Sequence, residues 1–393
     1  MKRKQLLIFV IWLGFVFVGC GRIAENTVTT QESNAQNQYM MASSVSFQET
    51  DDGFYGNSLF GRFLQYYDKN SGVAGILCAN PACMHDSSDC GAYMQAGATL
   101  SVYDGKLYWV AQDQQNGRDY ALWRSDLAGM NREKVKPISF EDVILTYQPQ
   151  RYAVHHRKLF ILGQFSSVTG TQVGYQVSLL SAPLDGSEDM TVLYEEQIDR
   201  GVQSTVRFVG DAVYLSLVTF PEGGPFDVTV MKFDIQDGKQ SILYHESGMT
   251  VIPGDFWITE QEELYLPGAD TDHAYVWKIE NGIRKEMISW DGSDPSVPKI
   301  LDGIAIYFSM DGRDRHIGIA DLNGEVVYDG VLFSEGIPGA NGDPNEYGFT
   351  VVGGDAEKVI LNLQDFSSRQ FENYTVMLDL KNHLKPTVLW SSQ

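Results

Sequence analysis

Residues 105–109 read GKLYW, and residues 122–129 read LWRSDLAG. The first stretch opens on a turn residue, Gly105, and continues with apolar and aromatic residues that favour a strand. The second stretch is another strand, and it ends at Asp126 and Gly129, which are residue types typical of tight turns. Together the two stretches predict antiparallel strands joined by short turns.

This pair of stretches recurs along the chain at intervals of about fifty residues. Further copies of the first stretch lie at 53–55, 157–161, 211–215, 262–266, 303–308 and 357–361. Further copies of the second lie at 66–72, 182–186, 231–238, 277–282, 319–324 and 377–382. A unit of this size is typical of a four-stranded blade, which buries its faces by stacking radially on its neighbours. The sequence therefore predicts an all-β protein, a seven-bladed β-propeller, with six blades and an extra sheet as the alternative.

The chain begins with a secretion signal. Lys2, Arg3 and Lys4 precede an apolar run over residues 6–18, interrupted only by Gly14. That run reaches about 20 Å as a helix, too short for a bilayer core of about 30 Å, so it is a signal rather than a span. Residues 17–20, FVGC, resemble the bacterial lipobox, although Phe17 stands where Leu is usual. The resemblance implies cleavage before Cys20 and acylation of its thiol, with palmitate-type chains; an ordinary signal peptide is the alternative.

These features divide the chain into three parts. Residues 1–19 form the signal peptide, and residues 20–45 form the lipidated Cys20 with a tether rich in Asn, Gln, Thr and Ser. Residues 46–393 form the propeller. We expect the protein to lie on the outer face of the cell membrane, because two acyl chains suffice for stable anchoring.

The net charge narrows the class of partner. Its value is −22, and removal of the three cations in residues 1–19 lowers it to −25. Such a charge repels nucleic acid and favours solubility, so we expect no nucleic-acid partner and a monomer.

Three further cysteines and a histidine lie within residues 78–90, between the first two blades. Cys78, Cys83, His85 and Cys90 form a C-x4-C-x-H-x4-C array. Four such ligands match a closed tetrahedral site that holds one structural Zn or Fe ion. The alternative is one disulfide with a spare thiol, which an oxidising exported location would favour.

Two resemblances follow from these motifs. Residues 122–131, LWRSDLAGMN, are similar to the strand and turn of TolB-like propeller repeats. In residues 54–135 the cysteine array lies between a tyrosine-rich strand and the GKLYW stretch. This segment resembles propeller lipoproteins of anaerobic Gram-positive, clostridial-type bacteria. The second resemblance implies fold and location, not an activity, and an anaerobic habitat favours thiols and metal over a disulfide.

Other polar clusters are interpreted as turns. His155 and His156 are expected in a solvated turn, because neighbouring strand residues point to opposite faces. Residues 270–273 and 311–316 concentrate Asp and His in loops where turn chemistry explains them. Residues 341–346, NGDPNE, offer oxygens for calcium but do not fit the EF-hand spacing.

Two functional hypotheses remain. The first is a non-enzymatic surface module that binds an extracellular glycan, peptide or protein. The second is an extracellular glycan-active enzyme, a hydrolase or lyase, that uses carboxylates or histidines gathered at one mouth of the propeller channel. No catalytic residue is assigned, because the sequence contains none of the nucleophile or metalloprotease motifs that would identify one.

Overall fold

The computed structural model describes residues 38–40, 46–57, 61–94, 99–112, 120–138, 151–169, 172–221, 224–293, 295–311, 314–332, 347–365 and 373–391. Cys20 and the predicted signal peptide lie outside these ranges. The described residues all belong to one compact unit, Gln36–Gln393. Among them, no helix is long and apolar enough to cross a membrane.

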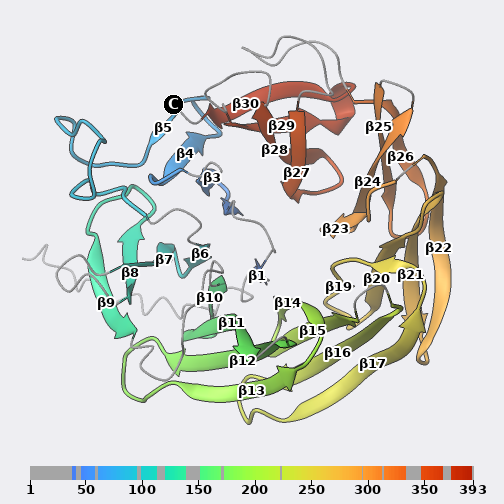
Figure 1. Ribbon diagram of the computed structural model, residues 1–393. Helices are drawn as coiled ribbons and strands as arrows, with labels where there is room; N and C mark the ends of the chain where they lie inside the picture. The colour runs from blue at the N-terminus through green and yellow to red at the C-terminus, as the bar shows by residue number, and fades with distance from the viewer. Residues whose placement is uncertain are drawn as a thin grey trace, which may run out of the picture. The chain divides into compact units, whose positions relative to one another are not determined.

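Seven antiparallel sheets follow one another around a central axis (Figure 1). The prediction of a seven-bladed β-propeller is confirmed, and the six-bladed alternative is wrong. Blade 1 contains β2 (Phe47–Glu49), β3 (Gly53–Gly56), β4 (Gln65–Asp68) and β5 (Ala74–Ile76). Blade 2 contains β6 (Leu100–Tyr103), β7 (Lys106–Gln112), β8 (Tyr120–Asp126) and β9 (Glu133–Ile138). Blade 3 contains β10 (Arg151–His155), β11 (Lys158–Thr169), β12 (Gln172–Pro183) and β13 (Thr191–Ile198).

The remaining blades repeat this order. Blade 4 contains β14 (Gly201–Val209), β15 (Ala212–Phe220), β16 (Phe226–Asp234) and β17 (Gln240–Met249). Blade 5 contains β18 (Ile252–Pro253), β19 (Trp257–Ile258), β20 (Leu264–Ala269), β21 (His273–Glu280) and β22 (Ile283–Asp291). Blade 6 contains β23 (Lys299–Leu301), β24 (Ile304–Asp311), β25 (Asp314–Asp321) and β26 (Val326–Val331). Blade 7 contains β27 (Tyr347–Gly354), β28 (Lys358–Asp365), β29 (Asn373–Asp379), the 3-10 turn η2 (Leu380–Asn382) and β30 (Lys385–Ser391).

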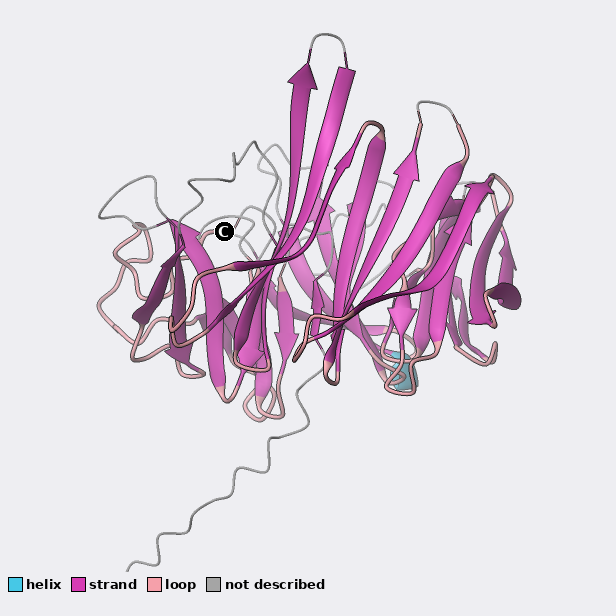
Figure 2. Cartoon of the chain, turned by 90° about the horizontal axis from the view of Figure 1, so that it is seen from below, coloured by secondary structure: helices cyan, strands magenta, loops and turns pink. Residues whose placement is uncertain are grey.

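The antiparallel order gives the ring two unlike faces. In each blade the turn after the first strand and the turn after the third strand lie at one end, which we call the turn face. The hairpin after the second strand and the connection to the next blade lie at the other end, which we call the hairpin face. Figure 2 shows strands extending furthest on the hairpin face. The predicted tight turns are on the turn face, where Asp104 and Gly105 have φ values of 49° and 66°.

The core consists of apolar clusters between neighbouring blades. Between blades 3 and 4, for example, the rings of Phe160 and Phe208 lie 5.0 Å apart and both are fully buried. Similar clusters join the other neighbouring blades. The strand faces are therefore apolar on both sides, because each blade is packed between two others.

One strand lies outside this repeat. β1 (Gln38–Met40) pairs antiparallel with β14, the strand of blade 4 nearest the axis. It falls within residues 20–45, the stretch that the sequence analysis assigned to the tether. The sequence predicted a tether without regular structure over residues 20–45, and the strand β1 near the C-terminal end of that stretch was not predicted.

Candidate metal centre

The Cys/His loop (residues 77–94) connects blade 1 to blade 2, as the sequence predicts. It lies against the turn after the third strand of blade 2, where a Cβ on Gly129 would be 2.7 Å from Leu77 O. Backbone hydrogen bonds close the loop at its base: Leu64 N–H donates to Ala92 O over 2.8 Å, and Leu77 N–H donates to Leu64 O over 2.8 Å. Cys78 and Cys90 therefore come next to each other at the two ends of the loop. Pro81 and the tight turns around it prevent a regular strand, and His85 has a φ of 53°.

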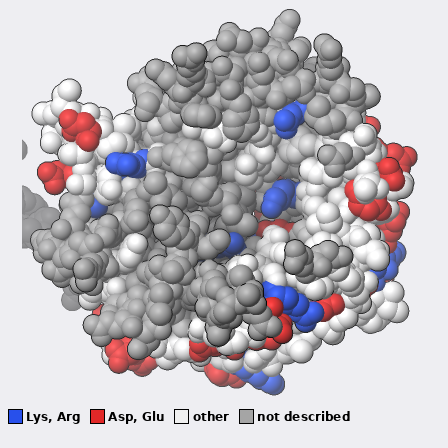
Figure 3. All heavy atoms as spheres, viewed as in Figure 1, with Lys and Arg blue, Asp and Glu red and all other residues white. Residues whose placement is uncertain are grey.

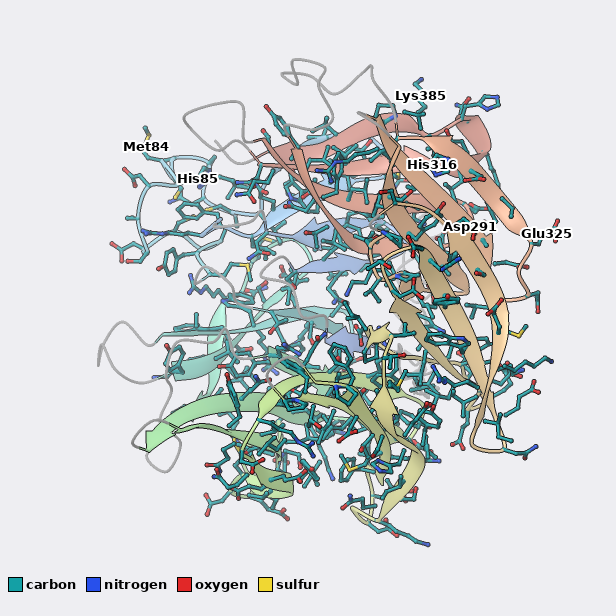
Figure 4. All side chains as sticks on the ribbon, turned by 45° about the vertical axis from the view of Figure 1, so that its right-hand side comes forward. Met84, His85, Asp291, His316, Glu325 and Lys385 are labelled. Carbon is teal, nitrogen blue, oxygen red and sulfur yellow. The ribbon has the colours of Figure 1, made fainter. Side chains whose placement is uncertain are left out.

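All four predicted ligands converge. One donor atom from each of Cys78, Cys83, His85 and Cys90 lies within 4.8 Å of every other. His85 Nδ1 lies 3.3 Å from Cys90 Sγ. Figure 4 shows the His85 side chain on this loop beside Met84, which is 81% exposed.

This arrangement fits a tetrahedral metal site. Zinc bonded to thiolates and an imidazole separates its ligand atoms by about 3.5–3.8 Å, given its usual bond lengths. The observed donor atoms need to move by only about 1 Å to reach those separations. None of the three described cysteines is joined in a disulfide. All four donors come from the protein, so a bound ion would have no open coordination position.

The thiols differ in their surroundings. Burial raises the pKa of the Cys90 thiol to about 12, although the backbone N–H of Ala92 donates to Cys90 Sγ over 3.4 Å. Partial burial also acts to raise the pKa of Cys78. Hydrogen bonds from the backbone at Asn80 and from the other two thiols outweigh it, so the pKa of Cys78 is lowered.

Arg132, which no sequence motif indicates, holds the loop against blade 2. Its Nη1 donates to Cys90 O over 2.8 Å. Its guanidinium lies 4.7 Å from the ring centroid of Trp123 and 5.6 Å from that of Trp109. Trp109 and Trp123 are direct cross-strand partners. Only their register creates this contact, so nothing in the sequence near Arg132 signalled it.

The His155–His156 pair corrects one expectation. His155 is fully buried rather than solvated. Both side chains place Nε2 against Gly210 O, at 2.8 Å for His155 and 2.9 Å for His156. They join blade 3 to the first turn of blade 4 instead of forming a ligand pair.

Two of the predicted polar clusters lie on the hairpin face: residues 270–273 in blade 5, and residues 314–316, the described end of the second cluster, in blade 6. Asp270 Oδ1 accepts hydrogen bonds from the backbone N–H groups of Asp272 and His273, over 2.9 and 2.8 Å, so it serves the turn as predicted. His273 Nε2 lies 3.5 Å from Asp291 Oδ1, and His316 Nε2 lies 3.3 Å from Asp329 Oδ1. Figure 4 shows His316 and Asp291 on these neighbouring blades. We call His273, Tyr275, Asp291, His316 and Asp329 the blade 5/6 cluster.

Residues 341–346, the predicted calcium candidates, lie outside the described part of the chain. Figure 3 looks onto the hairpin face and shows Asp and Glu atoms mainly along the rim, with Lys and Arg atoms nearer the middle.

Close to the axis, Arg207 Nη2 donates to Asp255 Oδ2 over 3.0 Å, and both side chains are buried. Arg207 also donates to Phe256 O, so this ion pair joins blade 4 to blade 5.

Comparisons with known proteins give the fold. No family model and no curated protein matches the sequence. A prolyl endopeptidase structure matches 91% of this chain at 12% identity with a TM-score of 0.54, and this chain spans half of its length. TolB from Acinetobacter baumannii is 11% identical over 89% of this chain and 79% of its own, with a TM-score of 0.40. The β-propeller domain of the Trilobed protease from Pyrococcus furiosus is 13% identical over 91% of this chain and 98% of its own, with a TM-score of 0.44. At these identities the likeness concerns the fold alone: the chain is a β-propeller.

Proposed function

We propose that this chain is a lipid-anchored module on the outer face of the membrane, held through acylated Cys20, that binds an extracellular glycan, peptide or protein. The observation that carries the non-catalytic role is the closed Cys/His site. The four described side chains that could hold a metal ion would all be its ligands, so a bound ion would have no position for a substrate. Its role is then to brace the loop between blades 1 and 2.

The metal we propose at Cys78, Cys83, His85 and Cys90 is one structural Zn ion, with Fe as the alternative. Three thiolates and a neutral imidazole around a divalent ion leave a net charge of −1. The guanidinium of Arg132, which touches the Cys90 carbonyl, supplies a compensating positive charge. The proposed lipoprotein relationship to anaerobic Gram-positive bacteria is consistent with reduced thiols.

Elemental analysis of anaerobically purified protein tests the metal. We expect about one Zn or Fe per chain, with loss of most of it in Cys83→Ser because a hydroxyl is a poor ligand for a soft site. Met84→Ser, next to it and exposed, is the matched control and should keep the metal. A metal-free wild type whose mass is two units low would instead indicate a disulfide.

A binding screen tests the module. Cell-wall fragments, polysaccharides and host glycans would be immobilised and probed with the purified full chain. The blade 5/6 cluster is the first surface to vary, because Tyr275 is half-buried there, with its hydroxyl on Asp270 at 3.1 Å and its ring 5.1 Å from Trp277. We expect Asp291→Asn, at a side chain that is 93% exposed, to weaken binding without altering the fold. Turnover without any binding partner would contradict this function.

One observation favours the enzyme alternative. Carboxylates from three blades lie near one another at the turn face: Glu49, Asp302 and Asp355. Partial burial, with the charges of Asp355 and Glu49, raises the pKa of Asp302. Lys358 Nζ lies 3.1 Å from Glu49 Oε1 and also contacts Asp355. A carboxyl with a raised pKa beside other carboxylates is the pattern of a general acid in glycan cleavage.

Activity measurements on polysaccharides test this alternative. If the chain is a glycan-active enzyme, Asp302→Asn lowers turnover by about 100-fold or more, as expected when a general acid is lost. Asp104→Asn, at the equivalent turn of blade 2, leaves turnover unchanged. Wild-type protein that turns over none of the polysaccharides it binds would exclude the enzyme.

A further inference from the structure

The direction of β1 shows at which mouth the chain enters the central channel. β14 runs toward the turn face, because it ends at Val209, directly before the turn at Gly210 and Asp211. β1 is antiparallel to it, with Gln38 opposite Phe208 and Met40 opposite Val206. Gln38 therefore lies close to the turn face, and the chain proceeds from there into the channel.

β1 occupies the turn-face end of the inner edge of β14. Nearer the hairpin face, Gln164 Nε2 of blade 3 donates to Val202 O over 3.0 Å. Arg151 of the same blade donates to Ser204 O. These side chains satisfy carbonyls that a longer added strand would use, and the described residues of β1 pair with Val206–Phe208. The chain then continues to β2, which again runs toward the turn face and ends before the turn at Thr50 and Asp51.

We propose that the turn face is directed at the membrane and that the hairpin face, with the blade 5/6 cluster, is directed outward. This orientation rests on the proposed lipid anchor at Cys20. About 18 residues join Cys20 to Gln38, and the flexible tether that the sequence predicts there would span roughly 23 Å on average. Its full reach is about 60 Å, and only a nearly extended chain would pass around the rim to invert the ring.

The negative charges of the turn face affect how this face interacts with a membrane surface. Its turns carry Asp68, Asp126, Asp234 and Asp321, whose carboxylates accept backbone hydrogen bonds within their own turns. Such a face does not adhere to anionic lipid, but the repulsion is screened beyond a Debye length of about 8 Å. The propeller is thus held off the membrane by its tether with the acidic face beneath it.

Energy transfer to labelled lipid tests the orientation. Lipidated full-length protein is added to phosphatidylcholine vesicles that contain a rhodamine lipid, and a donor dye is attached through a click-reactive residue. One version carries the dye at Ile283, which is 70% exposed at the turn-face end of blade 5. The other carries it at Thr271, in the hairpin at the opposite end of the same blade. The two sites are separated by β21, of eight residues, or roughly 26 Å.

We expect transfer from Ile283 to exceed that from Thr271 by roughly twofold, since the second donor lies a strand length further away. Gln38→Pro combined with Met40→Pro removes the N–H donors of β1 and should shrink the difference while the protein stays on the vesicles. Equal or reversed transfer in vesicle-bound protein overturns the orientation alone, as does a difference that the proline pair leaves unchanged. Protein that does not sediment with the vesicles overturns the anchor, and the orientation with it.

Discussion

His155 and His156 are adjacent in the sequence, yet only one of them is withdrawn from water. His155 ends β10 and packs against Phe208 of blade 4, with ring centroids 5.4 Å apart. Burial lowers the pKa of His155 to about 4, a shift only partly opposed by the carbonyl of Gly210. The native protein therefore holds this imidazole neutral, whereas in the unfolded chain its pKa is about 6.5.

The consequence is a pH-dependent stability. Between pH 6.5 and pH 4 the unfolded state binds more protons at His155 than the native state, so stability falls as the pH falls. We expect this residue to account for a loss of about 2 kcal/mol in the free energy of unfolding between pH 7 and pH 5. Denaturant unfolding of His155→Gln at the two pH values should show that part of the loss removed. His156→Gln, which contacts the same carbonyl, is the control and should keep the wild-type dependence; identical slopes for all three proteins would contradict the prediction.

The cysteine site is the residue-scale feature that the sequence predicted most completely. Short spacing alone brings Cys78, Cys83, His85 and Cys90 into one loop, because a chain of thirteen residues has little room to separate them. The brace from Arg132 was not predictable, since Arg132 is about forty residues away and lies in the turn between β8 and β9 of blade 2.

At the scale of strands, several blades place an aromatic ring over a glycine of the neighbouring strand. Gly318 on β25 is the cross-strand partner of Tyr307 on β24. A Cβ at Gly318 would lie 1.8 Å from Tyr307 Cε1. The Tyr307 ring cannot easily move away, because it stacks on Trp290 of blade 5 with centroids 4.5 Å apart. Gly268 and Gly201 are covered in the same way by Trp277 and Phe220.

Gly318→Ala should therefore destabilise the protein by about 1–3 kcal/mol, as expected for overpacking. Gly75→Ala is the matched control. Gly75 is also a strand glycine directly opposite a tyrosine, Tyr66, but a Cβ there would meet that ring at an ordinary 3.5 Å. Thermal or denaturant unfolding of the two variants should separate them clearly. A Gly318→Ala protein as stable as Gly75→Ala would show that the ring yields without cost.

At the scale of the whole molecule, the described residues close the ring without a shared strand. Blade 1 is built from β2–β5 and blade 7 from β27–β30, so no strand pairing within the described ranges joins the first blade to the last. Side chains close the gap instead. Phe47 stacks on Trp390 with centroids 6.1 Å apart, and Gln65 Nε2 donates to Ser391 O over 3.2 Å. Lys358 of blade 7 also pairs with Glu49 of blade 1.

Trp390→Ala should cost about 3–5 kcal/mol, the range for removing a large buried side chain, and should loosen this junction first. Hydrogen exchange is the discriminating measurement. We expect faster exchange in β2 and β30 than in the wild type, with blades 4 and 5 unaffected. Trp290→Ala removes an equally large, buried ring between blades 5 and 6, and its faster exchange should be confined there. Uniformly faster exchange in both variants would mean that the ring opens as one unit.

The sequence by itself determined the repeat and the gathering of the Cys/His ligands and favoured seven blades over six, because each depends on residues close together in the chain. Strand periodicity and turn residues act within one blade, and the metal ligands lie within one loop. Only the tertiary structure decided what depends on contacts between distant segments. These are the burial of His155, the brace from Arg132, the closure at Trp390 and the pairing of β1 with β14. Each arises from packing between blades or beside the channel, where residues far apart in sequence meet and no local pattern records which will be neighbours.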